Sequence, residues 1–461
     1  MPILPIDAGR YGSREIRRIF DDEQVLRYSL EFEACVAEVQ SMLGIIPRDA
    51  GIEIARKARS GIVRLERVRE LEAVREHDVA AMVEALVEVC DDVAKPWVHY
   101  GLTSYDVVDS RIAMQLRDAL VVIERKMKRL TLLLVEKAIA YRDVPAVGRT
   151  HGQHASIISF GLKFAVWASD MLMHIKGINE VKDRVLVCKT LGVVGTGSLM
   201  GDRAVDVQAM VAERLGLKPI DAATQVVSRE RIAELIARLA LIASTLEKIA
   251  VEIRNLQRTE IGEVMEPFKE GQMGSSAVPV KRNPIKSERV SSIAKMMRSM
   301  LIVALENIPL WHERDLSNSA NERFIIPMSI ILLDEMLDSM IGVISGLIVN
   351  LDDIRRNIYV SKGQIFAEFV LDVLIRKGMD RIKAYSIVQS IAFNTSMKGV
   401  EFRDALMEDP RITSLLSREE IDSLFDARKY LASSSRIIDG VVNSVYSVCK
   451  EEEEESMDTT S

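Results

Sequence analysis

The stretch from Gly271 to Arg289 combines small residues with groups that could do acid–base chemistry and bind an anion. Its first half is rich in glycine, serine and alanine, so we expect a mobile loop able to close over a ligand. Asn283 followed by Pro284 predicts the start of a long helix, with Asn283 as its N-cap. Lys281 and Asn283 therefore lie at the positive end of a helix, where unpaired backbone N–H groups favour an anion. A carboxylate is the expected guest.

Two histidines, His151 and His154, lie close together in the run Gly-Arg-Thr-His-Gly-Gln-His. They could be zinc ligands, but no third histidine, cysteine or carboxylate is fixed near them in sequence, so we expect no metal. They could also be partly exposed loop histidines. A third possibility is proton transfer, because an imidazole has an unperturbed pKa of about 6.5 and exchanges protons near neutrality.

Hydroxyl and imidazole groups also precede two predicted helices nearer the N-terminus. Thr103 and Ser104 follow Gly101 at a helix start, where hydroxyls usually cap backbone N–H groups but can also hold a carboxylate. His77 and Asp78 open another amphipathic helix, for which a cap and a surface imidazole are the simplest interpretation.

The run from Gly274 to Pro284, Gly-Ser-Ser-Ala-Val-Pro-Val-Lys-Arg-Asn-Pro, closely resembles the signature of the fumarase/aspartase/argininosuccinate lyase superfamily. The flanking residues most resemble the adenylosuccinate lyases, and matching residues extend from about Arg10 to Arg323. The resemblance implies β-elimination of fumarate from adenylosuccinate, giving AMP, and from SAICAR, giving AICAR, in purine nucleotide biosynthesis. It implies no cofactor and no metal, and a homotetramer in which each active site draws on three subunits.

Such an elimination needs a base, a means of stabilising a carbanion beside a carboxylate, and an acid for the departing nitrogen. By resemblance, Ser275 is the general base and His151 is the general acid. A serine is a poor base in water, so its alkoxide must be stabilised by Lys281, the helix end and loop N–H groups. Lys281 and Asn283 complete the catalytic set that the resemblance implies.

The resemblance also implies a set of substrate-binding residues. Thr103 and Ser104 match residues that hold the succinyl group. Arg10 and Tyr11 match a pair that contacts the nucleotide phosphate, which a guanidinium binds bidentately. The remaining matches are pocket, supporting and nucleotide-binding residues: His77, Asp78, His99, Thr150, Gln225, Arg289, Arg314, Ser319 and Arg323. These arginines favour a nucleotide substrate over a bare amino acid or malate.

Long helices must position these groups. Between Ser110 and Tyr141 apolar residues recur at three- and four-residue steps without proline or glycine, and comparable stretches cover 155–187, 228–264, 284–307 and 322–349. Five such helices indicate a bundle, because the heptad pattern is too irregular for a two-stranded coiled coil. We therefore predict an all-α fold with a central five-helix bundle. The resemblance implies that this bundle assembles into a tetrameric helical core.

We expect three helical domains and a tail. They are an N-terminal domain at 1–106, the bundle with its signature loop at 107–350, a C-terminal domain at 351–450 and an acidic, disordered tail at 451–461. The C-terminal domain is predicted to contain helices near 352–357, 366–377, 381–398, 402–408, 418–425 and 430–448.

The composition excludes several classes of protein. A net charge of −7 over 461 residues argues against a broad nucleic-acid-binding surface. The four cysteines are widely spaced, so neither a disulfide framework nor a zinc site is indicated, and a reducing cytoplasm fits. Neither a signal peptide nor an apolar run of membrane-spanning length is recognisable, so we expect a soluble, cytoplasmic protein that does not bind membranes.

The sequence departs from the family pattern in the signature. Val278 stands where methionine is usual, and Val280 where many of these lyases have a polar or aromatic residue, so contacts from these positions are not carried over. One alternative is another fumarate-releasing lyase, such as an argininosuccinate lyase, but Arg10, Tyr11 and the arginines near Arg314 count against it. A second alternative is a non-catalytic helical scaffold of the same fold, which the presence of the base, acid and lysine disfavours.

Overall fold

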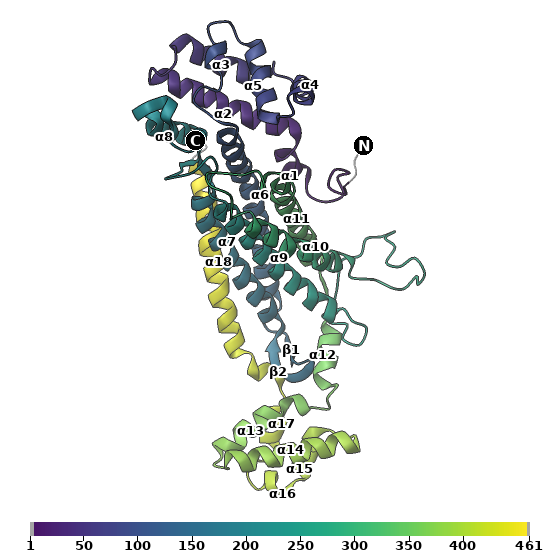
Figure 1. Cartoon of the computed structure of the whole chain (residues 1–461). Helices are drawn as coiled ribbons and strands as arrows, with labels where there is room; N and C mark the ends of the chain where they lie inside the picture. The colour runs from purple at the N-terminus through teal and green to yellow at the C-terminus, as the bar shows by residue number, and fades with distance from the viewer. Residues whose placement is uncertain (1–3, 459–461) are drawn as a thin grey trace. The chain divides into compact units, whose positions relative to one another are not determined.

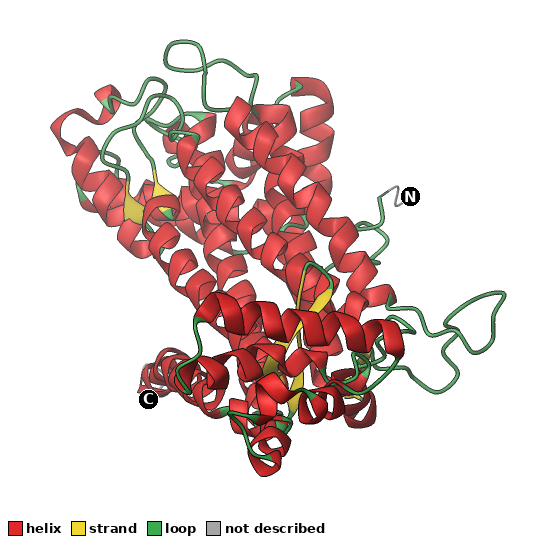
Figure 2. Ribbon diagram, turned by 90° about the horizontal axis from the view of Figure 1, so that it is seen from below, coloured by secondary structure: helices red, strands yellow, loops and turns green. Residues whose placement is uncertain are grey.

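Helices dominate the computed structural model, which describes residues 4–458 (Figures 1 and 2). The predicted all-α fold is confirmed: within those residues, eighteen α-helices are joined by loops and by six short strands that form three two-stranded ladders. The strands are β1 (Pro145–Thr150), β2 (Gln153–Ser159), β3 (Val187–Cys188), β4 (Lys218–Pro219), β5 (Val264–Met265) and β6 (Ile348–Val349). Their ladders are β1 with β2, β3 with β4 and β5 with β6.

All five predicted long helices are present. They are α6 (Ser104–Ala140), α7 (Phe160–Val185), α9 (Glu230–Leu256), α10 (Ile285–Glu306) and α11 (Ser319–Ser345). On α6 the predicted apolar stripe is buried, as Leu116, Leu120 and Ile123 show. Helix α7 begins later than expected because the residues before it form strand β2.

Thirteen further α-helices make up the rest of the described chain. They are α1 (Arg14–Ile19), α2 (Asp22–Met42), α3 (Arg48–Arg59), α4 (Leu65–Arg75), α5 (Asp78–Val89), α8 (Ala204–Arg214), α12 (Leu351–Tyr359), α13 (Ala367–Arg376), α14 (Arg381–Lys398), α15 (Phe402–Glu408), α16 (Pro410–Thr413), α17 (Arg418–Leu424) and α18 (Ala432–Asp458). The C-terminal helices agree closely with those predicted from hydrophobic periodicity.

By packing, the chain divides into two compact units. The first contains the residues up to Met127 together with His174–Leu246 and Ser292–Asp338. The second contains Lys128–Met173, Glu247–Ser291 and the residues from Ser339 onward. Each long helix contributes residues to both units. The domains expected at 1–106, 107–350 and 351–450 are continuous stretches of sequence, whereas the two units are groups of separate segments that pack together. The units therefore do not test the expected domains, which remain a prediction.

In the first unit, helices α2 to α5 form a compact group (Figure 1). Their apolar faces share one core with residues of α8, and Phe32, Ile54, Leu86 and Val207 are fully buried in it. Helix α2 is capped by Asp21, whose carboxylate accepts a hydrogen bond from the Gln24 N–H at 2.8 Å. This group carries the start of α5, where two candidate binding residues lie.

In the second unit, α13 to α17 pack around a separate core that includes Val370, Leu374, Phe402 and Leu406. A neighbouring cluster contains Val147 of β1, Ile157 of β2 and Phe366. The β1–β2 hairpin therefore rests on an apolar base and has a fixed orientation within this unit.

Polar contacts between long helices occur inside each unit. They are Lys126 of α6 with Asp334 of α11 (2.5 Å), His174 of α7 with Thr245 of α9 (2.8 Å), Lys163 of α7 with Glu252 of α9 (2.6 Å) and Arg254 of α9 with Ser291 of α10 (3.0 Å). These pairs join the long helices in two sets, α6 with α11 and α7 with α9 with α10.

Helix α18 continues to Asp458, so residues 451–458, expected as a disordered tail, are helical in the structure. The last residues of that tail, 459–461, lie outside the described part of the chain. Across residues 4–458 no helix is both long and apolar enough to cross a membrane.

Candidate active site

A cleft of about 670 Å³ in the first unit gathers candidate residues from distant parts of the sequence. It is lined by the start of α5, one face of α6 and the chain that leads into α11. Six of the predicted residues line it: His77, Asp78, Ser104, Arg314, Ser319 and Arg323. Between them lie Tyr105, Arg111 and Glu322, which sequence reasoning did not single out.

The helix start at His77 and Asp78 has both a capping and an electrostatic role. His77 is the N-cap of α5, and its Nδ1 accepts a hydrogen bond from the Ala80 N–H at 3.2 Å. An Asp78 carboxylate oxygen lies 2.8 Å from an Arg323 guanidinium nitrogen. Burial alone would raise the pKa of Asp78, but the Val79 N–H and the Arg323 charge together lower it. Asp78 is therefore an anion that largely neutralises Arg323.

Arg314 is held by two neutral groups. Its guanidinium lies 3.6 Å from the centre of the Tyr105 ring, a cation–π contact, and donates a hydrogen bond to Gln225 Oε1 at 2.7 Å. Gln225 in turn donates to the Val193 carbonyl at 3.0 Å. The predicted Gln225 thus orients Arg314 without cancelling its charge.

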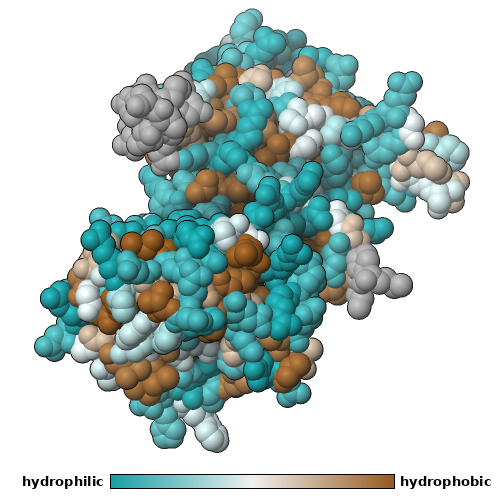
Figure 3. Space-filling view, turned by 90° about the horizontal axis from the view of Figure 1, so that it is seen from above, coloured by the Kyte–Doolittle hydropathy of each residue, from teal (hydrophilic) through white to brown (hydrophobic). Residues whose placement is uncertain are grey.

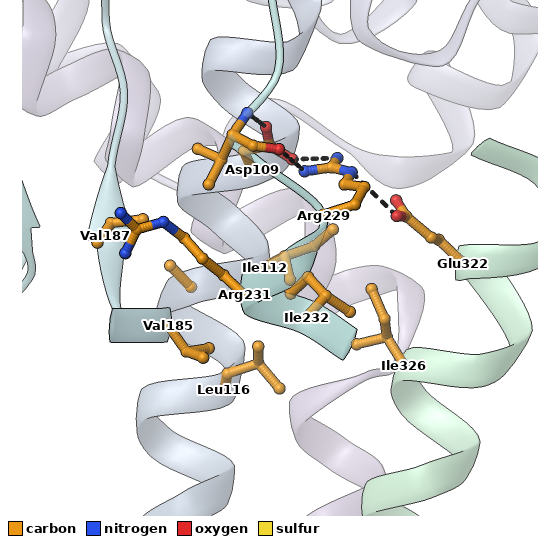
Figure 4. Close-up of a pocket in the computed structure, with 12 residues that line it drawn as sticks. Asp109, Ile112, Leu116, Val185, Val187, Arg229, Arg231, Ile232, Glu322 and Ile326 are labelled. Atoms are coloured by element: carbon orange, nitrogen blue, oxygen red, sulfur yellow. Dashed lines mark hydrogen bonds and ion pairs between the residues drawn. The ribbon is translucent and has the colours of Figure 1, made fainter. Parts of the chain in front are cut away.

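Beside the cleft, a buried arginine connects α6, the start of α9 and α11 (Figure 4). Arg229 donates to Asp109 at 2.7 Å and forms an ion pair with Glu322 at 3.0 Å. Burial raises the pKa of Glu322 although the Arg229 charge opposes this shift. Removing Arg229 would leave two buried carboxylates without their cation, so this triad holds the cleft wall in place.

The Thr103–Ser104 segment is positioned by a second buried ion pair. Asp106 pairs with Lys189, and both side chains are fully buried. The same carboxylate accepts hydrogen bonds from the Thr103 N–H at 2.8 Å and the Gly192 N–H at 3.0 Å. Asp106 therefore fixes the backbone of Thr103 against the glycine-rich turn, and the hydroxyls of Thr103 and Ser104 do not have to serve as caps.

His99 interacts with Glu33 of the first unit, and it is not among the residues that line the cleft. Its Nδ1 lies 2.6 Å from a carboxylate oxygen of Glu33, whose side chain is only 2% exposed. Burial lowers the pKa of His99, but the charge and hydrogen bond of Glu33 outweigh burial and raise it above the ordinary 6.5.

We expect this pair to make stability depend on pH. The pKa of His99 is higher in the folded protein than in the unfolded chain, so the pair contributes to the free energy of unfolding when His99 is protonated. This contribution is complete below about pH 6.5 and is lost as the pH rises through the pKa of His99 in the folded protein. Unfolding in urea at a series of pH values and one protein concentration should show this loss in the wild type. Glu33→Gln should lack it, whereas the control Glu31→Gln, on the same helix, should keep it. Identical pH dependence in wild type and Glu33→Gln would contradict the assignment.

In the second unit, His151 lies at the tip of the β1–β2 hairpin. Thr150 pairs with Gln153, which leaves His151 and Gly152 as a two-residue turn with φ angles of 54° and 75°. Positive φ at both positions is the geometry of a type I′ turn. The turn presents an exposed imidazole, as expected for a group that must reach a ligand. Within residues 4–458, no cluster of three or more histidine, cysteine or acidic residues could hold a metal.

The signature loop joins β5 to α10 and extends outward from the second unit in both Figure 1 and Figure 2. The Ser275 hydroxyl accepts hydrogen bonds from the Ala277 N–H at 3.3 Å and the Val278 N–H at 3.2 Å. Lys281 is exposed, as is Val280 at 87%. These two N–H donors are of the kind that stabilises a serine alkoxide.

The expected carboxylate site at the start of α10 is already filled by the protein itself. Glu266 is buried, and it accepts hydrogen bonds from the Lys286 N–H at 3.2 Å and the Ser287 N–H at 2.8 Å. Asn283 does not cap the helix with its side chain but donates to the Gly274 carbonyl at 2.9 Å. The prediction of Asn283 as side-chain cap is therefore wrong, and the N–H groups of Lys286 and Ser287 are not free for a ligand. A carboxylate bound by Lys281 and Asn283 stays a prediction.

A glutamine connects the two ends of the loop. Gln257 accepts a hydrogen bond from the Glu266 N–H and donates one to the Arg282 carbonyl, each at 2.9 Å. Together with Glu266 it closes the base of the loop, so the loop is anchored at both ends.

The remaining candidates lie elsewhere. Arg10 is exposed and Tyr11 half-buried, and neither lines the cleft. The neighbouring Ser13 N–H donates to Asp334 at 2.7 Å, which ties this segment to α11. Arg289 is exposed on α10 in the second unit.

Comparison with known proteins decides the family. A family model described as lyase matches residues 10–298, and a model described as adenylosuccinate lyase C-terminus matches residues 363–441. Adenylosuccinate lyase from Pyrococcus abyssi is 43% identical over 445 residues, which cover 96% of this chain and 98% of the relative. The chain belongs to the adenylosuccinate lyase family. Members from Methanocaldococcus jannaschii and Aquifex aeolicus are 40% and 39% identical, covering 96% and 94% of this chain and 96% and 98% of their own lengths.

Solved structures agree with this assignment. The fumarate lyase from Mesorhizobium sp. BNC1 superposes with a TM-score of 0.88 at 30% identity, covering 96% of this chain and 100% of that one. The 3-carboxy-cis,cis-muconate lactonizing enzyme from Pseudomonas putida has a TM-score of 0.87 at 28% identity, covering 96% and 99%. The helical fold is therefore shared with these two enzymes.

The residues missed from sequence have one property in common. Tyr105, Glu266 and Glu322 act through partners that are remote in the sequence, such as Arg314, 209 positions after Tyr105, so no local spacing marks them. Only the position of Arg111 carries a local signal, since it lies two helical turns after Ser104 and so shares its face of α6.

Proposed function

We propose that this protein is an adenylosuccinate lyase, which removes fumarate from adenylosuccinate to give AMP and from SAICAR to give AICAR. The observation that carries the proposal is the cleft in the first unit, where arginines, a histidine and the Ser104 hydroxyl converge. A guanidinium-lined cleft suits the phosphate and carboxylates of a succinylamino nucleotide.

The chemistry assigned to the second unit is a β-elimination. Ser275 takes the proton from the carbon beside the succinyl carboxylate, the electron pair forms the carbon–carbon double bond, and the carbon–nitrogen bond breaks. His151 gives a proton to the departing nitrogen. The N–H groups of Ala277 and Val278 lower the cost of charge on the Ser275 oxygen, and Lys281 and Asn283 belong to the same loop.

The test of this proposal is fumarate release by the purified protein from adenylosuccinate, SAICAR and argininosuccinate, offered separately. Release from either nucleotide supports the proposal and shows whether one or both substrates are used. Release from argininosuccinate alone would favour the alternative lyase, and release from none would favour the non-catalytic scaffold.

We also propose that the protein works as a homotetramer in the cytoplasm. Large apolar side chains are exposed on the long helices, including Val166, Met173, Leu241, Ile302 and Phe324, and Figure 3 shows apolar residues among polar ones on the face drawn. Such surfaces favour burial against further copies of the chain. All four cysteines are buried as thiols rather than joined in disulfides, which fits a reducing compartment.

A shared active site makes a specific prediction. In the second unit no hydrogen bond or ion pair among the described residues joins His151 to the signature loop, and the loop extends away from the hairpin (Figures 1 and 2). If different subunits supply Ser275 and His151, mixing inactive Ser275→Ala and inactive His151→Asn subunits should restore measurable fumarate release. Each variant refolded alone should remain inactive. Mixed oligomers without activity would contradict a site shared in this way.

A further inference from the structure

Four arginines line the cleft of the first unit, and they differ in what balances their charge. Arg69 pairs with Asp22 at 2.5 Å, and Arg323 pairs with Asp78 at 2.8 Å. Arg314 has only the neutral Gln225 and the Tyr105 ring. Arg111 makes no hydrogen bond or ion pair with any described residue. Two cations of the cleft, Arg111 and Arg314, therefore form no hydrogen bond or ion pair with a carboxylate of the described chain.

The guanidinium of Arg111 is also partly buried. Its Nε atom is buried and has no acceptor within residues 4–458, and the same holds for Nε of Arg314. Burial lowers the pKa of Arg111, and the nearby Arg323 charge lowers it further, although Asp78 opposes both effects. Burying a cation without an anion costs free energy, and the anion of a ligand would remove that cost.

The position of Arg111 indicates which anion it receives. Ser104, Val108, Arg111 and Gln115 lie on the face of α6 that lines the cleft. Arg111 is seven residues beyond Ser104, about 10 Å along the helix. The Thr103 and Ser104 hydroxyls are proposed to hold the succinyl carboxylates. A guanidinium about 10 Å away is suited to bind the phosphate, at the opposite end of the nucleotide.

We propose that Arg111 binds the phosphate of the nucleotide together with Arg314. This inference rests on the proposed function, and it adds a binding residue that the family signature does not mark. Two unpaired guanidinium groups match the charge of a phosphomonoester dianion, and each can donate two parallel hydrogen bonds to it.

Acidic residues near the cleft do not replace this anion. Glu322 is engaged with Arg229 at 3.0 Å. Glu72 and Glu76 of the α4 region also line the cleft, but neither forms an ion pair with Arg111 in the described chain. The charges of Asp78 and Asp109 act on Arg111 and favour its charged form, but neither carboxylate forms a hydrogen bond or ion pair with it in the described chain. The N–H groups of Arg111 therefore remain available to a ligand.

The test compares Arg111→Gln with a matched control. Arg69→Gln removes the same charge from the same cleft, but Arg69 is already paired with Asp22. Calorimetry should show AMP binding to Arg111→Gln weakened by roughly 10- to 100-fold, since a hydrogen bond to a charged group is lost. Arg69→Gln should bind AMP nearly as the wild type does, and adenosine should bind wild type and Arg111→Gln equally. Product inhibition by fumarate should also be unchanged.

Thermal unfolding tests whether Arg111 has only a structural role. If Arg111 served only to stabilise Asp78, Arg111→Gln would lower Tm in the absence of ligand. We expect Tm without ligand to be unchanged or higher, and the rise in Tm on adding AMP to be smaller than in the wild type. Unchanged AMP affinity, or a larger effect on fumarate than on AMP, would overturn the proposal. Because AMP binding needs no turnover, failure of this inference is distinct from failure to release fumarate.

Discussion

Replacing Ser275 with alanine is expected to lower kcat by about 10²- to 10⁴-fold, the usual contribution of a positioned general base. The Ser275 hydroxyl accepts the Ala277 and Val278 N–H groups at 3.3 and 3.2 Å, so its oxygen lies where charge on it would be stabilised. The loss should appear in kcat, while AMP affinity should change little because no cleft residue of the first unit is altered. The measurement is steady-state fumarate release together with calorimetric AMP binding.

Ser276→Ala is the matched comparison, since it removes the same hydroxyl from the next residue of the loop. If Ser276→Ala loses more turnover than Ser275→Ala, the base has been assigned one position too early. Far-UV circular dichroism of both variants should match the wild type, because the long helices lie outside the loop. A loss of helicity would make a kinetic reading of either variant invalid.

Hydrophobic periodicity predicted the helices well because a helix that buries one face carries apolar residues at three- and four-residue steps, and these steps can be read from a short stretch of sequence. The limits of α14 and α15 agree with those expected, and all five long helices occur where apolar residues recur. The division into two packed units could not be predicted in this way. Each unit is assembled from three separate segments, and its boundaries fall inside long helices where the sequence pattern does not change.

The hairpin under His151 was missed for a different reason. Two-residue turns of this type usually contain asparagine or aspartate before glycine, and His151-Gly152 does not carry that signal. The adjoining apolar residues of β2 were also compatible with the first turn of a helix, as short apolar runs often are.

The candidate site was predictable where residues match the family signature and unpredictable where contacts are remote. Ser104, Arg314 and Arg323 line one cleft, whereas Arg10 and Tyr11 do not, and the roles of all of them stay predictions. In contrast, the carboxylate that fills the start of α10 comes from Glu266, on the far side of the loop. When the group that bonds to a helix end comes from another segment, the sequence around the helix start does not reveal it. The N–H groups at the start of α10 were therefore expected to bind the anion of a ligand.

Replacing His151 with asparagine is the cleanest test of the general acid, because His151 has a φ of 54°. Alanine at a left-handed position costs roughly 1–2 kcal/mol, so His151→Ala would change both the turn and the chemistry. Asparagine favours this conformation, and His151→Asn should keep the hairpin while removing the imidazole. We expect kcat to fall by about 10²- to 10⁴-fold with Tm nearly unchanged.

His154→Asn supplies the comparison, because His154 lies on β2 of the same hairpin but is half-buried rather than presented at the tip. Its Nδ1 is buried without a partner among the described residues, and burial followed by the Arg149 charge lowers the pKa of this imidazole. A neutral, enclosed imidazole is a weaker candidate for donating a proton to a ligand, so His154→Asn should retain most turnover. If His154→Asn loses turnover and His151→Asn keeps it, the proton comes from the strand and the turn geometry serves only to close the hairpin.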